Sequence, residues 1–411
     1  MIYIVAAANI ICVICAYLKT RDVLHPAVVF STIVFYNYFL IWITGDISEY
    51  LGVYSNEALQ TSQFIYFITF IPIFVFLVIF SSKSKSENMN GSHLLFLSYL
   101  LKFSLVVIVS AVLVRLWYVN FAVDIFVEQT LGPRFGRSWM NTGAVGGSKE
   151  IASLLTLLLP VSVSCLGVLL VFSRFALLSS LCIYFVFISG CVLLFFEGSR
   201  IFFVVGTLPY LYLKFIRFAS VFQKSLFIPV LLILYYSIFS VIYNQRDSGF
   251  LDTVIFSTSD YTQDDSGFWV VNIVYMLLQE RNMPSFVDFI LASLFNFVPR
   301  SLWESKPLLD DVFYSGFKIS WVTVSRLGEF LMVFGFYFGV FVYWCVTFFV
   351  YRTLIYFYAF RKRFDGLILY MVLIVYVFMV ERSFLNFSQF IYAPLLVYLF
   401  FFFSKKRIIL S

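Results

Sequence analysis

The sequence predicts an all-α, polytopic integral membrane protein with about 11 transmembrane helices and one large extracytoplasmic loop. Of its 411 residues, 62% are apolar and only 12% are charged, whereas soluble domains are about 45 to 50% apolar and about 25% charged. Apolar runs long enough to cross a hydrocarbon core of about 30 Å recur along the whole chain. The composition excludes a soluble globular protein, and the recurrence of the runs excludes a single anchored domain.

Each expected span is a mainly apolar run bounded by polar or charged residues. The first run carries no basic region before it and no small-residue cleavage site after it, so we expect a retained helix instead of a signal peptide. The expected spans are residues 2–18, 23–43, 64–80, 95–119, 151–172, 175–196, 201–216, 225–243, 326–350, 366–380 and 387–403.

The distribution of Lys and Arg predicts the orientation of these spans, because basic residues in short loops stay in the cytoplasm. One set of loops holds 16 basic and three acidic residues, a net charge of +13, and the other set has a net charge of −7. We therefore expect a cytoplasmic C-terminus and, with an odd number of spans, an N-terminus on the outer side. The overall charge of +6 reflects this topology and does not indicate nucleic-acid binding.

The longest outer loop, residues 244–325, holds 82 residues, and loops of that length usually carry function. Two apolar stretches within it, Phe268 to Leu278 and Phe286 to Val298, are too short to span a bilayer. Their length suits re-entrant or interfacial helices, and the alternative is an amphipathic lid that lies on the bilayer without chemistry. The chain thus divides into N-terminal transmembrane helices (1–243), this loop, and C-terminal transmembrane helices (326–411).

Several classes of enzyme lack their sequence signatures here. No phosphate-binding Walker A loop, no dinucleotide-binding glycine pattern after a strand and no D-x-D pair for a divalent ion is present. The two histidines, His25 and His93, both fall in or near expected cytoplasmic segments, which excludes histidine catalysis on the outer face. We therefore expect no cofactor and no metal.

Arginines gather on the expected outer face. Because the planar guanidinium binds phosphate oxygens in pairs and stays charged when partly desolvated, several arginines at headgroup depth suit a lipid-linked pyrophosphate. The alternative for any one of them is an arginine that only reaches from a helix end to water. For Arg200 the turn Glu197-Gly198-Ser199-Arg200 leaves little room for that. The arginines in question are Arg115, Arg134, Arg137, Arg200, Arg246, Arg281, Arg300 and Arg382.

One stretch resembles a known family. Residues 298–307 read V-P-R-S-L-W-E-S-K-P, and Gly328-Glu329-Phe330 and the glycines Gly335 and Gly339 follow about twenty residues later. This arrangement resembles the oligosaccharide repeat-unit polymerases, that is, O-antigen polymerases of the Wzy type. The Gly198-Ser199-Arg200 turn and the interval from Arg300 to Gly316 are similar to looser patterns of the same family. The resemblance covers roughly residues 197–340.

The resemblance implies a membrane glycosyltransferase on the periplasmic face of the inner membrane. Such an enzyme takes a growing glycan from undecaprenyl pyrophosphate and joins it to the next lipid-linked repeat unit, with a flippase and a chain-length regulator as expected partners. The reaction needs cations on the departing pyrophosphate, for which Arg200 and Arg300 are the main candidates and Arg281 and Lys306 the supporting ones.

A carboxylate is also needed to deprotonate the acceptor hydroxyl, and Glu280, Glu304 and Glu329 are candidates in no particular order. Glu329 lies three residues from Arg326, so the two side chains share a helix face and an ion pair between them is the structural alternative. The spacing of Gly335 and Gly339 favours close helix packing over contact with sugar.

Two rival functions remain open. An O-antigen ligase has a similar span pattern, but that family relies on a loop histidine, and the loop at 244–325 has none. A lipid-linked oligosaccharide flippase or other transporter is expected to bury cations in the middle of its helices, where the expected spans are nearly free of charge. Sugar identity, linkage and chain length have no sequence signature.

Overall fold

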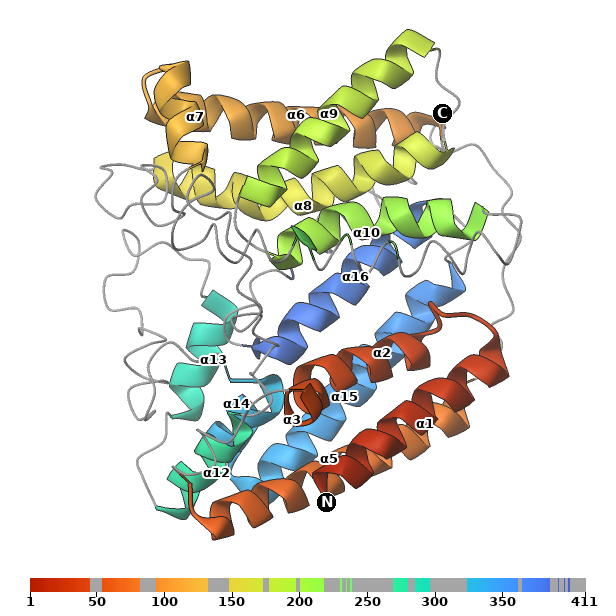
Figure 1. The fold of residues 1–411 in the computed structure, drawn as a ribbon, viewed down its shortest axis with the longest axis vertical. Helices are drawn as coiled ribbons and strands as arrows, with labels where there is room; N and C mark the ends of the chain where they lie inside the picture. The colour runs from red at the N-terminus through yellow and green to blue at the C-terminus, as the bar shows by residue number, and fades with distance from the viewer. Residues whose placement is uncertain are drawn as a thin grey trace. The chain divides into compact units, whose positions relative to one another are not determined.

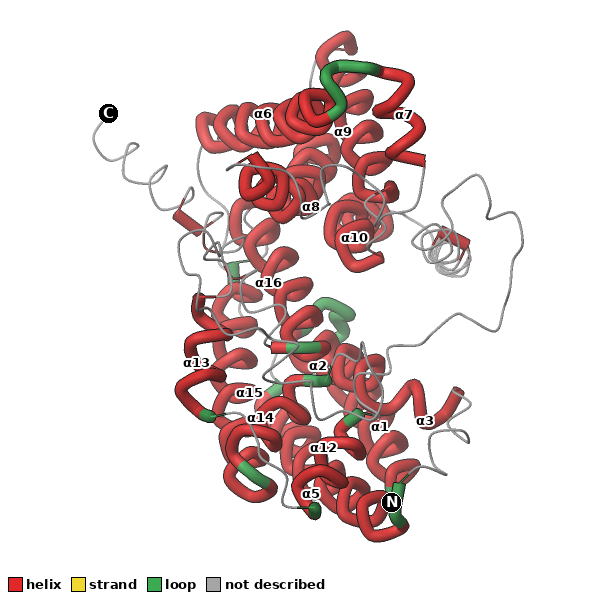
Figure 2. The backbone as a smooth tube through the Cα atoms, turned by 90° about the vertical axis from the view of Figure 1, so that its left-hand side faces the viewer, coloured by secondary structure: helices red, strands yellow, loops and turns green. Residues whose placement is uncertain are grey.

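The computed structural model describes a helical chain. In the residues that it describes, every regular element is a helix and none is a strand (Figure 2). The described residues are 1–44, 54–81, 94–131, 148–172, 177–196, 200–217, 269–279, 285–295, 324–360 and 364–384, together with a few isolated positions beyond residue 229. The all-α fold class predicted from the sequence is therefore confirmed for this part of the chain.

The chain forms two compact units (Figure 1). The first, called the terminal unit here, comprises Met1–Met89 and Thr262–Pro394, and the second, the central unit, comprises Asn90–Tyr261 and Leu395–Ser411. The short helices of the long loop that the structure describes belong to the terminal unit. The division of the chain at residues 243 and 325 stays a prediction.

The terminal unit contains helices from both ends of the sequence. Helices α1 and α2 pack on α5, and α15 packs on α2, α5, α14 and α16. Its elements are α1 (Ile2–Thr20), α2 (Pro26–Val34), η1 (Phe35–Phe39), α3 (Leu40–Thr44), α5 (Asn56–Phe80), α12 (Val270–Leu278), α13 (Phe286–Phe295), α14 (Arg326–Phe334), α15 (Phe336–Ala359) and α16 (Phe364–Arg382).

The second expected span, 23–43, is a helix with a local change of winding. Pro26 starts α2 at the position where a proline costs no hydrogen bond, and the Nδ1 atom of His25 accepts a hydrogen bond from the backbone N–H of Ala27 at 3.2 Å. His25 therefore acts as a helix cap. Five residues, Phe35–Phe39, then form a π-helical segment before α3 begins, and such segments are frequent at functional sites.

Helix α15 buries hydroxyl-bearing side chains and exposes large aromatic ones. Tyr343, Thr347 and Tyr351 are buried at helical spacing, while Tyr337 and Phe349 are 80% and 71% exposed. In water this pattern would be inverted, but in lipid the exposed aromatic side chains face hydrocarbon and the polar groups find partners inside.

The expected span 326–350 is wrong as a single helix. Gly335, with φ 73° and ψ −176°, separates α14 from α15, and that region of backbone conformation is accessible almost only to glycine. The long helix accordingly runs from Phe336 to Ala359. Hydropathy predicted one continuous span because α14 and α15 are both apolar.

The described parts of both apolar stretches form short helices, α12 and α13, and their re-entrant or interfacial position stays a prediction. α12 packs on α5 and α14, and most of its residues are buried, among them Val270 and Ile273. In α13, Phe289 is buried against Phe330 of α14, with ring centroids 6.0 Å apart. α12 therefore belongs to the packed interior of the terminal unit.

The central unit is a second helical bundle. α8 packs on α6, α9 and α10, and α7 follows α6. Its elements are α6 (Leu94–Tyr118), α7 (Val123–Leu131), α8 (Ser148–Phe172), α9 (Leu177–Phe196) and α10 (Arg200–Arg217). Except for α7, which was not expected, these helices correspond to predicted spans. The expected spans 225–243 and 387–403 lie outside the described residues apart from isolated positions.

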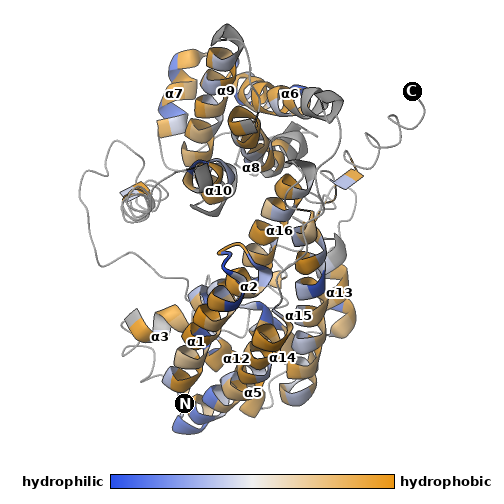
Figure 3. Ribbon diagram, turned by 90° about the vertical axis from the view of Figure 1, so that its right-hand side faces the viewer, coloured by the Kyte–Doolittle hydropathy of each residue, from blue (hydrophilic) through white to orange (hydrophobic). Residues whose placement is uncertain are grey.

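Four described helices are long and apolar enough to cross a membrane: Ile2–Thr20, Asn56–Phe80, Leu101–Tyr118 and Phe336–Ala359. Shorter apolar helices accompany them, and the hydropathy colouring is mainly orange along most of the helices (Figure 3). These are the features of a membrane-embedded helical protein, which is the coarse part of the sequence prediction.

Candidate functional site

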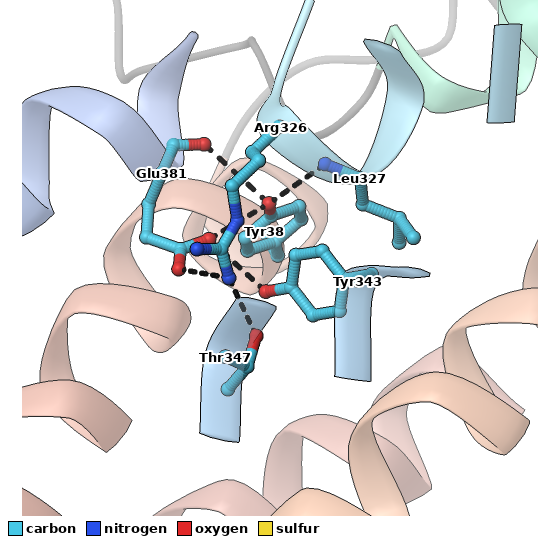
Figure 4. A network of polar contacts seen from close by, with 6 residues as sticks. All are labelled: Tyr38, Arg326, Leu327, Tyr343, Thr347 and Glu381. Carbon is cyan, nitrogen blue, oxygen red and sulfur yellow. Dashed lines mark hydrogen bonds and ion pairs between the residues drawn. The ribbon is translucent and has the colours of Figure 1, made fainter. Parts of the chain in front are cut away.

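A buried ionic cluster joins α14, α15 and α16 to the π-helical segment η1 in the terminal unit (Figure 4). Nη2 of Arg326, the first residue of α14, lies 2.6 Å from Oε1 of Glu381, in the last turn of α16, and both side chains are 0% exposed. Each charge sits at the less favourable end of its own helix, since helix N-termini favour anions and C-termini favour cations. The ion pair itself, and not the helix dipoles, therefore stabilises this arrangement.

Two tyrosine hydroxyls complete the shell of Glu381. The hydroxyls of Tyr38, from η1, and Tyr343, from α15, donate to Oε2 of Glu381 at 3.1 and 3.0 Å. The Tyr38 oxygen also accepts a hydrogen bond from the backbone N–H of Leu327 at 3.3 Å. Tyr38 thereby links the π-helical segment to the first turn of α14 and to the end of α16.

The guanidinium of Arg326 has one hydroxyl partner and one aromatic partner. Nη2 donates to Oγ1 of Thr347 at 2.5 Å, and the guanidinium carbon lies 4.4 Å from the ring centroid of Tyr343, a cation–π contact. Its Nε and Nη1 atoms make no hydrogen bond with any group that the structure describes. The cluster is therefore tightly packed, with incomplete pairing of its cation.

The depth of the cluster follows from its partners on α15. Tyr343 and Thr347 are the eighth and twelfth of the 24 residues of this helix, which places them about 11 to 17 Å from its start at 1.5 Å per residue. If α15 crosses the membrane, that level lies within the hydrocarbon core. Ionisable groups at such a depth mark a functional site by default.

Glu329, a predicted candidate base, lies fully buried one turn after Arg326. Its Oε1 accepts from the hydroxyl of Ser383 at 2.6 Å, and its Oε2 accepts from the backbone N–H of Phe384 at 2.7 Å. Each carboxylate oxygen thus binds a donor from the segment that follows α16. Arg326 forms its ion pair with Glu381, where the sequence suggested Glu329 as its structural partner.

The glycines beside these charges permit close packing. A Cβ on Gly328 would collide with Val324 and approach Val270 of α12 at 3.5 Å, and a Cβ on Gly339 would lie 2.8 Å from the carbonyl oxygen of Phe330. The predicted packing role is confirmed for Gly339, at which α14 and α15 meet backbone to backbone. In the Gly328-Glu329 pair, glycine leaves room for the side chain of Val324, just before α14, and glutamate binds the segment that follows α16.

The remaining predicted site residues are not positioned by the structure. Arg200 is the first residue of α10, and only its backbone is described. Five others, Glu280, Glu304, Arg281, Arg300 and Lys306, lie outside the described residues. The structure therefore positions only Glu329 among the predicted site residues, with Ser383 and Phe384 as its partners, and the roles of the other residues stay predictions.

Sequence reasoning did not join Arg326 to Glu381. Arg382, the neighbour of Glu381, stood out only as one of the outer arginines, and Arg326 only as a possible partner of Glu329. Tyr38 gave no signal, because a tyrosine in an apolar run is common in membrane helices. The helix break at Gly335, flanked by two apolar runs, was the one local feature that could have indicated a folded-back α14.

Comparison with known proteins adds no assignment. No protein-family model, no curated protein and no solved structure matches this chain.

Proposed function

We propose that this protein polymerises undecaprenyl-pyrophosphate-linked oligosaccharide repeat units into O-antigen or a similar surface polysaccharide. In this proposal it spans the bacterial inner membrane about 11 times, its C-terminus is cytoplasmic, and the loop at 244–325 faces the periplasm. It is a glycosyltransferase that needs neither nucleotide nor metal, because the lipid pyrophosphate already activates the sugar.

One observation carries the proposal furthest. The Gly328-Glu329 pair, which the resemblance to repeat-unit polymerases singles out, lies in the first turn of α14, which also carries Arg326 of the buried ion pair. Glu329 is fully buried and binds the hydroxyl of Ser383 and the backbone N–H of Phe384. The loop motif at 298–307 ends 18 residues before Ser325, the cap of α14. A rigid polar junction of this kind suits a loop that must hold charged groups at a fixed depth.

The proposed reaction exchanges one bond for another. The hydroxyl oxygen of the acceptor sugar attacks the anomeric carbon of the donor, the bond from that carbon to the pyrophosphate breaks, and the pyrophosphate leaves with the electron pair. Arg200 and Arg300, supported by Arg281 and Lys306, stabilise the charge that develops on the pyrophosphate. A carboxylate takes the hydroxyl proton, and Glu280 or Glu304 can do so from the loop.

Glu329 suits this base role less well than the two loop carboxylates. Both of its oxygens already accept hydrogen bonds, from the Ser383 hydroxyl and the Phe384 backbone, and a general base must reach the proton that it removes. Within the proposal, Glu329 therefore fixes the junction between α14 and the end of α16.

The test is a chromosomal deletion complemented with wild type, Arg300→Ala or Arg200→Ala at matched membrane abundance. Surface polysaccharide is read on a silver-stained gel. We expect the deletion to leave core lipid with a single repeat unit and both alanine variants to share that phenotype. Arg352→Ala is the matched control, because Arg352 is exposed on α15 and should support normal chains.

A second candidate function is transport of the lipid-linked oligosaccharide. The observation that favours it is the Arg326–Glu381 pair beside the middle of α15, since a flippase is expected to bury charge at that depth. The same gel separates the two functions. If the deletion leaves no capped core lipid at all, export or ligation has failed and the polymerase proposal is wrong.

A further inference from the structure

Helix α7 follows a candidate membrane span and has almost no protein core of its own. None of its nine residues, Val123–Leu131, is buried. A helix this short is not stable in water without tertiary packing, because nucleation costs more than so few hydrogen bonds return. Phe126, Gln129 and Thr130 have partners within the chain, whereas Val123 and Val127 are exposed, so the apolar surface of α7 that they form is left for contact with another apolar phase.

The side chains of α7 divide into an apolar and an acidic stripe. Val123 and Val127, one turn apart, are 63% and 46% exposed, and Leu131 continues the stripe at the same spacing. Asp124 and Glu128, also one turn apart, are exposed on the adjoining face. Figure 3 shows blue and orange segments side by side on α7. The exposed residues are Val123 and Val127 on the apolar stripe and Asp124 and Glu128 on the acidic one, while Leu131 is half-buried and the exposed Ile125 lies on the far side of the acidic stripe.

The apolar stripe continues the lipid-facing surface of α6. On α6 the exposed side chains recur at helical spacing through Val106, Val109, Leu113 and Trp117, with exposed fractions of 63%, 49%, 50% and 56%. The remaining faces of this part of the helix are buried or half-buried. Because Leu101–Tyr118 is a candidate span, this exposed row contacts lipid when the protein is in its membrane. The next exposed aromatic along the chain is Phe121.

A tight turn redirects the chain between α6 and α7. Asn120 and Phe121 have φ values of 53° and 61°, and the N–H of Phe121 donates to the carbonyl of Leu116 at 2.7 Å. α7 then runs at a steep angle to α6 in two views (Figures 1 and 2). A positive φ is unfavourable for a bulky residue, and Phe121 is 58% exposed, so protein packing does not compensate for the strain.

We propose that α7 is an interfacial helix that binds the headgroup–acyl boundary of the bilayer where α6 leaves the hydrocarbon. Val123, Val127 and the Phe121 ring enter the apolar side of the boundary, and Asp124 and Glu128 face water. Anionic lipids repel the acidic stripe, so the contact is apolar and salt, which screens the repulsion, does not release it. This role does not depend on the proposed polymerase function.

The test uses the full chain in vesicles of phosphatidylethanolamine and phosphatidylglycerol. An environment-sensitive fluorophore is attached to Val127→Cys or, as the matched control, to Glu128→Cys, both in one background whose six cysteines are replaced by serine. Quenching by aqueous iodide is compared with quenching by lipids that carry a nitroxide at the top or at the middle of the acyl chain.

We expect the label at Val127 to be quenched most by the shallow nitroxide and the label at Glu128 most by iodide, and we expect high salt to leave the shallow quenching of Val127 in place. Equal iodide quenching at both positions would place the helix in water and overturn the proposal. Shielding of Val127 from every quencher would show a protein partner or a second copy on the stripe. Stronger quenching by the deep nitroxide, or release by salt, would equally refute an apolar interfacial helix.

Discussion

Helices α8, α9 and α10 pack differently from α14, α15 and α16. In the first group, helices approach where side chains are missing: a Cβ on Gly167 would lie 2.8 Å from Cβ of Tyr210, and one on Gly190 would lie 2.6 Å from Val163. In the second group, a glycine contact at Gly339 is joined by a buried ion pair. The hydrophobic effect contributes little to helix association in lipid, so helices associate through close packing and polar contacts.

Because of this difference, we expect substitutions in the two groups of helices to affect stability differently. At a glycine contact, neighbouring side chains can make small adjustments. A buried charge that loses its partner destabilises the fold strongly, because nothing then offsets the free energy of its desolvation. The cluster at α14–α16 therefore holds its helices in one arrangement. Each experiment below perturbs one contact and compares the loss of stability with that of a matched variant.

The largest effect is expected for Arg326→Met, which leaves Glu381 buried without its cation. We expect a loss of about 3 to 5 kcal/mol in the free energy of unfolding, measured by chemical unfolding in mixed micelles. The double variant Arg326→Met with Glu381→Gln removes both charges and should recover most of that loss. A double variant as unstable as the single one would show that the ion pair is not what Arg326 contributes.

Gly339→Ala should give the second-largest loss of unfolding free energy. The new Cβ would meet the backbone of Phe330 and Leu331 at 2.8 and 2.9 Å, and backbone cannot rotate away, so we expect a loss of about 1 to 3 kcal/mol. Gly190→Ala is the counterpart in the central unit, where the obstacles are side-chain atoms of Val163 and Ile108. The same unfolding assay should give a smaller loss there, and the reverse order would contradict the contrast between the groups.

Tyr343→Phe removes one hydroxyl from Glu381 and keeps the ring beside Arg326. A hydrogen bond to a charged group contributes about 1.5 to 3 kcal/mol, and we expect a loss near the lower end because Tyr38 still donates to the same oxygen. Tyr351→Phe is the matched control on the same helix, since its buried hydroxyl has no described hydrogen-bond partner. An equal loss of unfolding free energy in the two variants would show that the hydrogen bond from Tyr343 to Glu381 does not contribute to stability.

The smallest effects compare two serines. Ser383→Ala deletes the donor to Oε1 of Glu329 and should cost about 1 kcal/mol. In α8 the hydroxyl of Ser162 donates only to the carbonyl of Leu158 in its own helix, a contact that adds little to stability. Ser162→Ala should therefore leave the unfolding midpoint unchanged. If Ser162→Ala shifts the unfolding midpoint as much as Ser383→Ala, the hydrogen bond of Ser383 to Glu329 contributes no more to stability than a bond within one helix.

Hydropathy located most helices well because it is a local property. The expected spans 2–18 and 95–119 correspond to α1 (Ile2–Thr20) and α6 (Leu94–Tyr118). It failed where the deciding feature was a single backbone conformation, because the positive φ of Gly335 leaves the surrounding hydropathy unchanged. α7 was missed because a nine-residue amphipathic helix is too short for a span and carries two acidic residues.

The candidate site was less accessible from the sequence. Glu329 was identified through a family resemblance, but its partner Ser383 lies 54 residues away, and Tyr38 and Glu381 are separated by 343 residues. No local pattern specifies contacts over such distances. The arginines and carboxylates of the loop that were chosen for catalysis remain predictions from residue chemistry.

The sequence by itself determined that the chain has a membrane as its solvent and that its backbone is helical, because every buried peptide group in lipid must find its partner within the structure. Only the tertiary structure decided the depth of the charges. Arg326 and Glu381 stand at the ends of helices in the sequence, yet the folding of α14 back along α15 places them beside the middle of that helix. Where a charged side chain is buried depends on which helices pack together, and local hydropathy does not predict helix packing.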